Sequence, residues 1–433
     1  MLNIKSKFSL NIDQQNKKRL TALVIILMIS IIGVRTLIFS HAQSPYTSVN
    51  TDSGTVSGRA TVQTDPSTSN GKYVQFGPIN GNANNIAGAV LGDYIEAGPS
   101  STNYSEIDNF ISSTGSTPGL IQAFFGLNID SNNNSTAFPT SFVNKVSSLN
   151  STPMVVMSVS APSSPGTQLL NAIGNATPAE NQNIKDWAKQ AKNYGKPLYI
   201  RLMWEFNGEW YPWGLNYIPP GSTIGNGATP AVYKAAYINI VQQFQAVGAN
   251  NVQFVWCVSV NGDQNTSDLT ASYPGDQYVD WVAMDGYNRN GSISQGGTSG
   301  QQTFSGIFST DYNLLTSISK RPVMIAETAA IEDLTNPTYK SDWITNNFSS
   351  LGLSLPKVKA VLYFDGFGHG YCYPFTAPPL PQTGTIAETY APGGVCSALS
   401  GSPSATNALL KYNAISNNSY FKNIGAPTNP ITY

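Results

Sequence analysis

Ile200–Gly214 reads IRLMWEFNGEWYPWG, and Arg321–Thr328 reads RPVMIAET; these two stretches decide the fold. Each predicts a buried strand that ends on a carboxylate, Glu205 in the first stretch and Glu327 in the second. Because side chains alternate along a strand, Arg201 and Glu205 are expected on the same face of theirs. An isolated buried charge is costly, so two glutamates at two strand ends indicate an acid/base pair.

Similar apolar runs recur along the chain and predict eight strands. They are expected at Ala87–Ile95, Leu120–Gly126, Pro153–Val159, Leu198–Glu205, Val252–Ser259, Tyr278–Asp285, Pro322–Glu327 and Val358–Asp365. Amphipathic stretches that predict helices lie between or after these strands, at Tyr104–Ser113, Ala179–Tyr194, Pro230–Val247, Ser305–Ser319, Tyr339–Leu351 and Ala405–Tyr420. A Thr-Pro pair marks two of the expected helix starts.

Strands that alternate with helices over about 350 residues predict an α/β fold, namely a (β/α)8 or TIM barrel with long loops. We assign the barrel to residues 85–433. A doubly wound sheet is the alternative, but no glycine-rich phosphate-binding loop follows the first expected strand. In a (β/α)8 barrel the chemistry lies at the carboxyl ends of the strands, where Glu205 and Glu327 are expected.

The composition is poor in charge. Only 11% of the residues are charged, against about a quarter in an average protein. The formal net charge of −1 offers no basic surface for nucleic acid, so no nucleic-acid partner is expected. A neutral surface rich in Tyr and Asn suits an uncharged polar partner such as a glycan, although many exported proteins share this composition.

The N-terminus predicts export. Basic residues precede an apolar run at residues 20–39, which is broken only by Arg35, and Ser40-His41-Ala42 follows with small residues suited to signal peptidase. Residues 1–42 are therefore interpreted as a cleaved signal peptide or an uncleaved membrane tether. Either way the protein is expected to be secreted or anchored at the cell surface. Residues 43–84 are rich in Ser, Thr and Gly and predict a linker with one strand-like piece, Gly71–Gly77.

The cysteines fit an exported protein. Cys257 lies in an apolar strand pattern and predicts a buried free thiol. Cys372 and Cys396 flank a loop rich in Pro and Gly and are predicted to form a disulfide. The only histidine after residue 42 is His369, and no Cys-x-x-Cys pair is present. A metal site of the usual His/Cys type is not expected, and no cofactor is predicted.

Aromatic residues crowd the same strand ends as the glutamates. The candidates for substrate contact are Arg201, Trp204, Trp210, Trp213, Tyr287, Phe364 and Phe367. Flat aromatic rings can stack on the apolar faces of sugar rings, while carboxylates and amides accept hydrogen bonds from hydroxyl groups. This combination favours a polysaccharide partner. Asp285 and Asp365 are expected to be structural or to bind hydroxyl groups.

Arg201–Gly214, Val279–Asn288 (VDWVAMDGYN) and Arg321–Thr328 together resemble glycoside hydrolase family 26, which contains mainly secreted β-mannanases. The resemblance implies a retaining mechanism in which Glu205, at the end of the fourth strand, is the acid/base. Glu327, at the end of the seventh, would be the nucleophile. It also implies that Trp210 lines the sugar site and that Tyr287 contacts the nucleophile.

Two positions depart from the family pattern. The family usually has histidine immediately before the acid/base, where this chain has Trp204. It commonly has a tryptophan platform at the end of the eighth strand, where only Phe364 and Phe367 are available. The expected activity is that of a monomeric endo-β-mannanase on mannan or glucomannan. A β-glucanase or xylanase with the same glutamate pair, and a non-catalytic glycan-binding barrel, are the alternatives.

Overall fold

A computed structural model describes residues 60–64, 72–76, 88–95, 104–130, 137–161, 169–223, 225–288, 302–330, 336, 338–368, 371–372 and 403–421. Strands β1 (Ala60–Thr64) and β2 (Lys72–Phe76) pair into a two-stranded sheet of their own. Strand β2 confirms the strand-like piece expected in the linker. The segment 1–42 lies outside the described residues, as does most of the linker.

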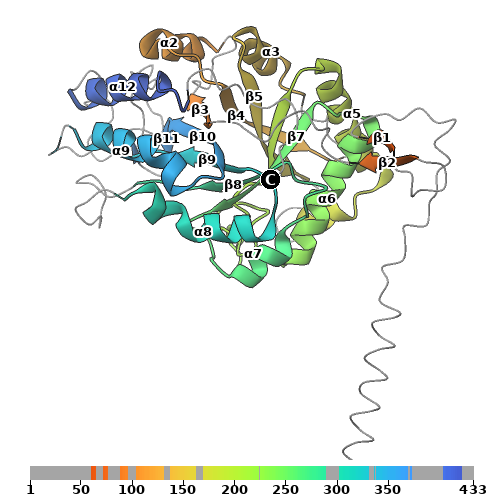
Figure 1. The fold of residues 1–433 in the computed structure, drawn as a ribbon. Helices are drawn as coiled ribbons and strands as arrows, with labels where there is room; N and C mark the ends of the chain where they lie inside the picture. The colour runs from red at the N-terminus through yellow and green to blue at the C-terminus, as the bar shows by residue number, and fades with distance from the viewer. Residues whose placement is uncertain are drawn as a thin grey trace, which may run out of the picture. The chain divides into compact units, whose positions relative to one another are not determined.

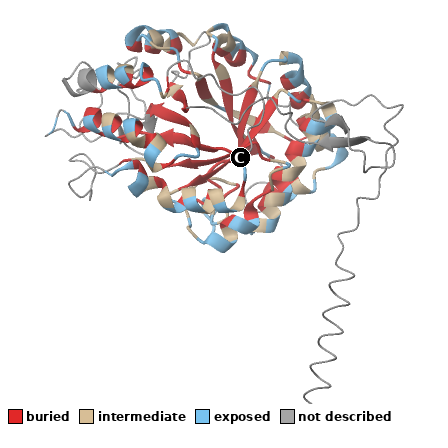
Figure 2. Ribbon diagram, in the orientation of Figure 1, coloured by how far each residue is buried: buried red, intermediate tan, exposed pale blue. Residues whose placement is uncertain are grey.

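Eight parallel strands close into a barrel in the order β10-β3-β4-β5-β6-β7-β8-β9 (Figure 1). They are β3 (Val90–Ile95), β4 (Leu120–Asn128), β5 (Thr152–Ser160), β6 (Leu198–Leu202), β7 (Val252–Ser259), β8 (Trp281–Asp285), β9 (Val323–Thr328) and β10 (Val358–Asp365). All eight expected strands are present, and the predicted (β/α)8 barrel is confirmed. Strands β6 to β9 are buried along their whole length, as expected for a parallel sheet covered on both faces (Figure 2).

Helices surround the strands (Figure 1). They are α2 (Ser105–Thr114), α3 (Thr140–Ser148), α4 (Leu169–Gly174), α5 (Pro178–Tyr194), α6 (Pro230–Val247), α7 (Thr266–Ser272), α8 (Phe304–Ile318), α9 (Tyr339–Ser354) and α12 (Pro403–Ser416). Both Thr-Pro signals are confirmed, because the hydroxyl groups of Thr177 and Thr229 cap α5 and α6. The sequence missed α3, α4 and α7, which are short.

One strand boundary differs from the prediction, and the difference lies at the candidate site. Strand β6 ends at Leu202 rather than at Glu205. Beyond it, Met203 and Glu205 have φ values of 43° and 52°, in the left-handed region. Strand alternation therefore does not extend to Glu205, whose direction is set by this irregular turn.

Other expectations concern residues whose structure or side chains are not described. The backbones of Phe367 and Cys372 belong to a short antiparallel pair, β11 (Phe367–Gly368) and β12 (Tyr371–Cys372). Cys396 and His369 lie outside the described residues, as does the apolar run 20–39. No helix in the described part of the chain has the length and apolarity needed to cross a bilayer. Cys257 is a buried free thiol, as predicted.

Candidate active site

The two glutamates lie at the carboxyl ends of the fourth and seventh barrel strands. Glu327 is part of β9, and Glu205 follows the last residue of β6 by three positions. Both are largely buried, with 8% of Glu205 and 6% of Glu327 exposed. A buried carboxylate needs compensating partners, and the two glutamates have different ones.

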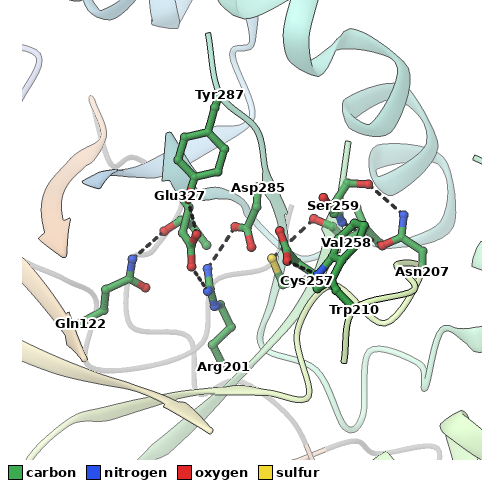
Figure 3. A network of polar contacts seen from close by, with 12 residues as sticks. Gln122, Arg201, Asn207, Trp210, Cys257, Val258, Ser259, Asp285, Tyr287 and Glu327 are labelled. Atoms are coloured by element: carbon green, nitrogen blue, oxygen red, sulfur yellow. Dashed lines mark hydrogen bonds and ion pairs between the residues drawn. The ribbon is translucent and has the colours of Figure 1, made fainter. Parts of the chain in front are cut away.

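Glu327 is held at both of its oxygens (Figure 3). Nη2 of Arg201 pairs with Oε1, and the hydroxyl group of Tyr287 donates a hydrogen bond to Oε2. Nη1 of Arg201 donates to Oδ1 of Asp285 at 3.0 Å. Two carboxylates thus share one fully buried guanidinium group. The expected contact between Tyr287 and Glu327 is present.

Glu205 has a neutral partner instead. Nε1 of Trp210 donates a hydrogen bond to Oε2 of Glu205 at 2.7 Å. Burial, and next the negative charge of Glu327, raise the pKa of Glu205 to about 7, while the charge of Arg201 and the Trp210 hydrogen bond lower it. A carboxyl group with this pKa can both donate and accept a proton near neutral pH.

The other charged groups of the site depend on one another. Burial raises the pKa of Asp285 well above its ordinary value, and the positive charge of Arg201 only partly opposes this effect. Burial by itself would lower the pKa of Arg201. The negative charges of Asp285 and Glu327 outweigh this effect and hold the pKa of Arg201 well above its ordinary value. The guanidinium group therefore stays charged next to Asp285 and Glu327.

Glycines allow the loop after Glu205 to pack tightly. A Cβ atom on Gly208 would lie 2.5 Å from the ring of Trp210, and one on Gly214 would lie 2.4 Å from the carbonyl oxygen of Gly208. Asn207 fixes the start of this loop to β7, since its side chain donates to the carbonyl of Ser259 at 2.8 Å and accepts from its N–H at 2.9 Å. The motif NGEWYPWG thus encodes a compact loop that carries Trp210 to Glu205.

Aromatic rings connect the partner of one glutamate to the partner of the other. Successive ring centroids lie 4.4–6.4 Å apart along a series that we call the aromatic wall: Trp210, Tyr211, Trp204, Phe124, Tyr94, Phe364 and Tyr287. Phe124 is the most open of these rings, with 37% of the residue exposed. The ring of Trp204 also lies 5.6 Å from the guanidinium carbon of Arg201, within reach of a cation–π interaction.

The structure brings together most of the residues that the sequence singled out. Arg201, Trp204, Trp210, Tyr287 and Phe364 all contact one of the glutamates or belong to the aromatic wall. Trp213 is buried, with only 3% of the residue exposed, so it offers no open surface to a substrate. Its ring stacks on Tyr211, and its Nε1 donates to the carbonyl oxygen of Trp204 at 2.8 Å. The side chain of Phe367 lies outside the described residues.

Sequence reasoning missed Tyr94 and Phe124. Both lie within strands of the barrel, where an aromatic residue is expected in the core. No local pattern separates a core aromatic from one that faces the mouth of the barrel. The segment Leu120–Asn128 contains two adjacent phenylalanines, and strand alternation alone places them on opposite faces.

A closed parallel barrel with two differently partnered carboxyl groups at its strand ends, next to a wall of aromatic rings, has the architecture of a glycoside hydrolase. Within the described residues, no group of three or more His, Cys, Asp or Glu side chains is arranged to hold a metal ion.

Comparison with known proteins points to one family. Residues 153–340 match the family model of glycosyl hydrolase family 26. The match contains Glu205, Glu327, Arg201 and Tyr287.

Three similar proteins are informative. Endoglucanase H of Acetivibrio thermocellus is 40% identical over 181 residues, which cover 42% of this chain and 19% of that protein. A mannan endo-1,4-β-mannosidase of Bacillus subtilis is 32% identical over 105 residues, covering 24% of this chain and 27% of that protein. The catalytic domain of a family 26 endo-β-1,4-mannanase of Bacillus sp. JAMB-750 has a TM-score of 0.52 at 17% identity. That similarity covers 77% of this chain and 87% of the solved chain, and it shows the fold.

Proposed function

We propose that this protein is a retaining glycoside hydrolase that cleaves a β-linked polysaccharide by double displacement. The observation that carries the proposal is the unequal environment of the two glutamates. Glu327 is held by Arg201 and Tyr287, whereas Glu205 has a neutral donor and a pKa raised to about 7. Two carboxyl groups in different environments are what an acid/base and a nucleophile require.

In the first step, an oxygen of Glu327 attacks the anomeric carbon and forms a glycosyl ester. The glycosidic C–O bond breaks, and Glu205 gives its proton to the leaving oxygen. In the second step, the carboxylate of Glu205 removes a proton from water. The water oxygen displaces Glu327 from the anomeric carbon, so the product keeps the configuration of the substrate and both glutamates return to their first state.

The surroundings support each role. Arg201 and Tyr287 fix both oxygens of Glu327, which limits the rotation of the attacking group. Trp210 donates to Oε2 of Glu205 as a neutral group, so it does not hold the carboxyl group permanently ionised as a cation would. The Glu327 charge favours the protonated form of Glu205 and is neutralised when the glycosyl ester forms, which prepares Glu205 to act as a base.

The first candidate substrate is mannan or glucomannan, cleaved within the chain. This choice is supported by the family 26 match and by the similarity to a Bacillus subtilis mannan endo-1,4-β-mannosidase. The chain spans only 19% and 27% of the two curated relatives described above, so their substrates are a guide and not an assignment.

The second candidate substrate is a β-glucan. Two observations favour it: the relative with 40% identity over 181 residues is named an endoglucanase, and Trp204 occupies the position at which mannanases of the family usually have histidine. In the aromatic wall, Trp204 is 5% exposed and its ring packs against Phe124, where histidine would place two polar nitrogens.

We further propose that the protein acts outside the cell as a monomer, released after cleavage within residues 1–42 or tethered through residues 20–39. The support is the basic and apolar pattern of that segment. N-terminal sequencing of the protein recovered from culture medium and from membranes would distinguish release from tethering.

The function is tested with a panel of mannan, glucomannan, mixed-linkage β-glucan and xylan. We expect reducing sugar from one of these glycans and the same anomeric configuration in the first product seen by proton NMR. Inversion of configuration would overturn the double-displacement mechanism. The absence of hydrolysis on every β-glycan would favour the glycan-binding alternative.

A further inference from the structure

The backbone that presents Glu205 is held in an unusual conformation. Met203 and Glu205, on either side of Trp204, both have φ values in the left-handed region, which residues other than glycine adopt rarely. Such a conformation persists only when the surrounding structure fixes it, and it is concentrated at functional sites. We call Met203–Glu205 the elbow, because it turns the chain from β6 into the loop that carries Trp210.

The neighbouring strands hold two of the three backbone N–H groups of the elbow, those of Met203 and Glu205. The N–H of Met203 donates to the carbonyl of Met157 in β5 at 3.0 Å. The N–H of Glu205 donates to the carbonyl of Cys257 in β7 at 3.0 Å. The elbow therefore keeps its place in the barrel wall even though it has left strand geometry.

The carbonyl groups of the elbow are held from the other side. The indole N–H of Trp213 donates to the carbonyl of Trp204 at 2.8 Å. The N–H of Gly208 donates to the carbonyl of Glu205 at 2.9 Å. The third carbonyl, that of Met203, accepts from the hydroxyl group of Tyr233 at 3.1 Å. This last donor belongs to α6, outside the barrel.

Tyr233 contacts the chain both before and after Glu205. Its hydroxyl group holds Met203, two residues before the glutamate. Its ring stacks on Phe206, the next residue after the glutamate, with centroids 4.2 Å apart and planes at 21°. Tyr233 is fully buried, and no part of it is open to a substrate.

We propose that Tyr233 is a positioning residue for the acid/base: its hydroxyl group locks the elbow and thereby fixes the carboxyl group of Glu205 opposite Glu327. The proposal rests on the proposed function in so far as it concerns catalysis. Its structural part, the control of Glu205 by a hydroxyl group on α6, stands on the contacts alone.

The chain offers a matched control on the same helix. Tyr237 lies one turn after Tyr233 in α6 and is also fully buried, but its hydroxyl group has no hydrogen-bond partner among the described residues. Tyr233→Phe and Tyr237→Phe each remove one buried hydroxyl group and keep the ring. Only the first change releases the elbow.

The catalytic test compares substrates that need the acid to different degrees. With aryl β-glycosides of the sugar selected by the glycan panel, a phenol of high pKa needs protonation to leave, and dinitrophenol does not. On the substrate with a phenol of high pKa, Tyr233→Phe is expected to lower kcat/KM at least about tenfold, because general acid catalysis contributes this much or more. On the dinitrophenyl substrate, kcat/KM should be nearly unchanged. Tyr237→Phe should match the wild type on both. Equal losses on the two substrates would indicate general damage to the site and overturn the proposal.

A second test does not depend on activity. The indole N–H of Trp210 is bonded to Glu205, so its NMR signal should move as Glu205 ionises. The signal is assigned by its loss in Trp210→Phe, and it should titrate near pH 7 in the full-length wild type and in Tyr237→Phe. In Tyr233→Phe the midpoint should fall by about 0.5 pH unit or more, because a displaced carboxyl group is less buried and farther from Glu327.

The outcomes separate this proposal from the proposed function. A shifted midpoint with no hydrolysis by the wild type would reject the enzyme activity and keep the role of Tyr233 in placing Glu205. Wild-type hydrolysis with an identical midpoint in both tyrosine variants would reject the role of Tyr233 and keep the enzyme.

Discussion

Trp210 donates a hydrogen bond to Glu205 across a distance of 2.7 Å, from the loop that the glutamate itself begins. The bond connects the protonation of Glu205 to the position of an aromatic ring. The ring in turn lies against Gly208, where a Cβ atom would collide with it. The hydrogen bond and this close packing together fix the Trp210 ring beside Glu205.

The pH dependence of activity should report this bond. Glu205 must be protonated to act as an acid, so kcat/KM is expected to fall as the pH rises through its pKa of about 7. The Trp210 hydrogen bond favours the charged form, and its removal in Trp210→Phe should therefore raise this pKa and move the alkaline limb to higher pH. An alkaline limb that stays in place in Trp210→Phe would show that Glu205 is not the titrating acid.

Removal of the whole ring tests whether Trp210 contacts the sugar. Trp210→Ala is expected to lower turnover more than it raises KM, because stacking at the cleavage point contributes mainly in the transition state. Kinetics and melting temperature are measured on one preparation. A large fall in melting temperature with unchanged kinetics at low temperature would identify Trp210 as a packing residue.

Replacement of the nucleophile should abolish turnover without unfolding the protein. Glu327→Ala is expected to lower kcat by several orders of magnitude, and added azide should restore part of it by occupying the vacated space. The product should be an α-glycosyl azide, which NMR can identify. Near-normal activity of the variant without azide would refute the assigned mechanism.

The buried guanidinium group should matter for stability as well as for catalysis. Arg201→Met leaves Asp285 and Glu327 without their shared cation and is expected to lower the free energy of unfolding by about 3–5 kcal/mol. Urea denaturation measures this change. Lys189→Met, which removes the exposed ion pair with Asp186, is the control and should cost about 0.5 kcal/mol or less. Equal losses in the two variants would contradict the buried network.

Phe124 offers a test of the aromatic wall. Phe124→Ala is expected to raise KM on the polysaccharide about tenfold, since stacking of a flat ring contributes about 1–3 kcal/mol by analogy with base–aromatic stacking. Its neighbour Phe125 packs on Phe142 of α3, with ring centroids 5.2 Å apart, on the opposite face of β4. Phe125→Ala should lower the melting temperature and leave KM unchanged. The reverse result would place Phe124 in the core.

The disulfide between Cys372 and Cys396 remains a prediction. It would close a loop of about 25 residues and stabilise the protein by about 3 kcal/mol on the chain-entropy account. Mass spectrometry of a digest prepared without reductant should find the linked peptide. Two free thiols in protein made under oxidising conditions would exclude the bond.

The barrel could be predicted because its strands are buried on both faces. Strand β10 has the predicted bounds, and β7 begins and ends where the apolar run does. The predicted end of β6 was wrong, because no local pattern in the sequence indicates the left-handed φ values of Met203 and Glu205. This backbone is held by hydrogen bonds that it donates to β5 and β7 and one that it accepts from α6, and these elements are distant in the chain.

The site was predictable to the extent that its chemistry is uncommon in a core. Arg201, Glu205 and Glu327 were evident because charged residues at the ends of apolar strands require a reason. Tyr233 and Phe124 were not evident, since a tyrosine in an amphipathic helix and a phenylalanine in a strand are ordinary core residues. Only the neighbours that folding brings to them give these two residues a role.

Because of the elbow, positions 205 and 327 differ in how well their backbone accepts a replacement residue. At position 205, glycine or asparagine relieves the left-handed backbone, whereas alanine keeps its cost. Position 327 lies in β9 beside a shift in strand register, but its φ is not in the left-handed region, so a replacement there does not meet that backbone cost. An inactive protein meant to trap an intact glycan for crystallography is therefore best made as Glu327→Gln, which leaves the acid/base and its strained support in the native arrangement.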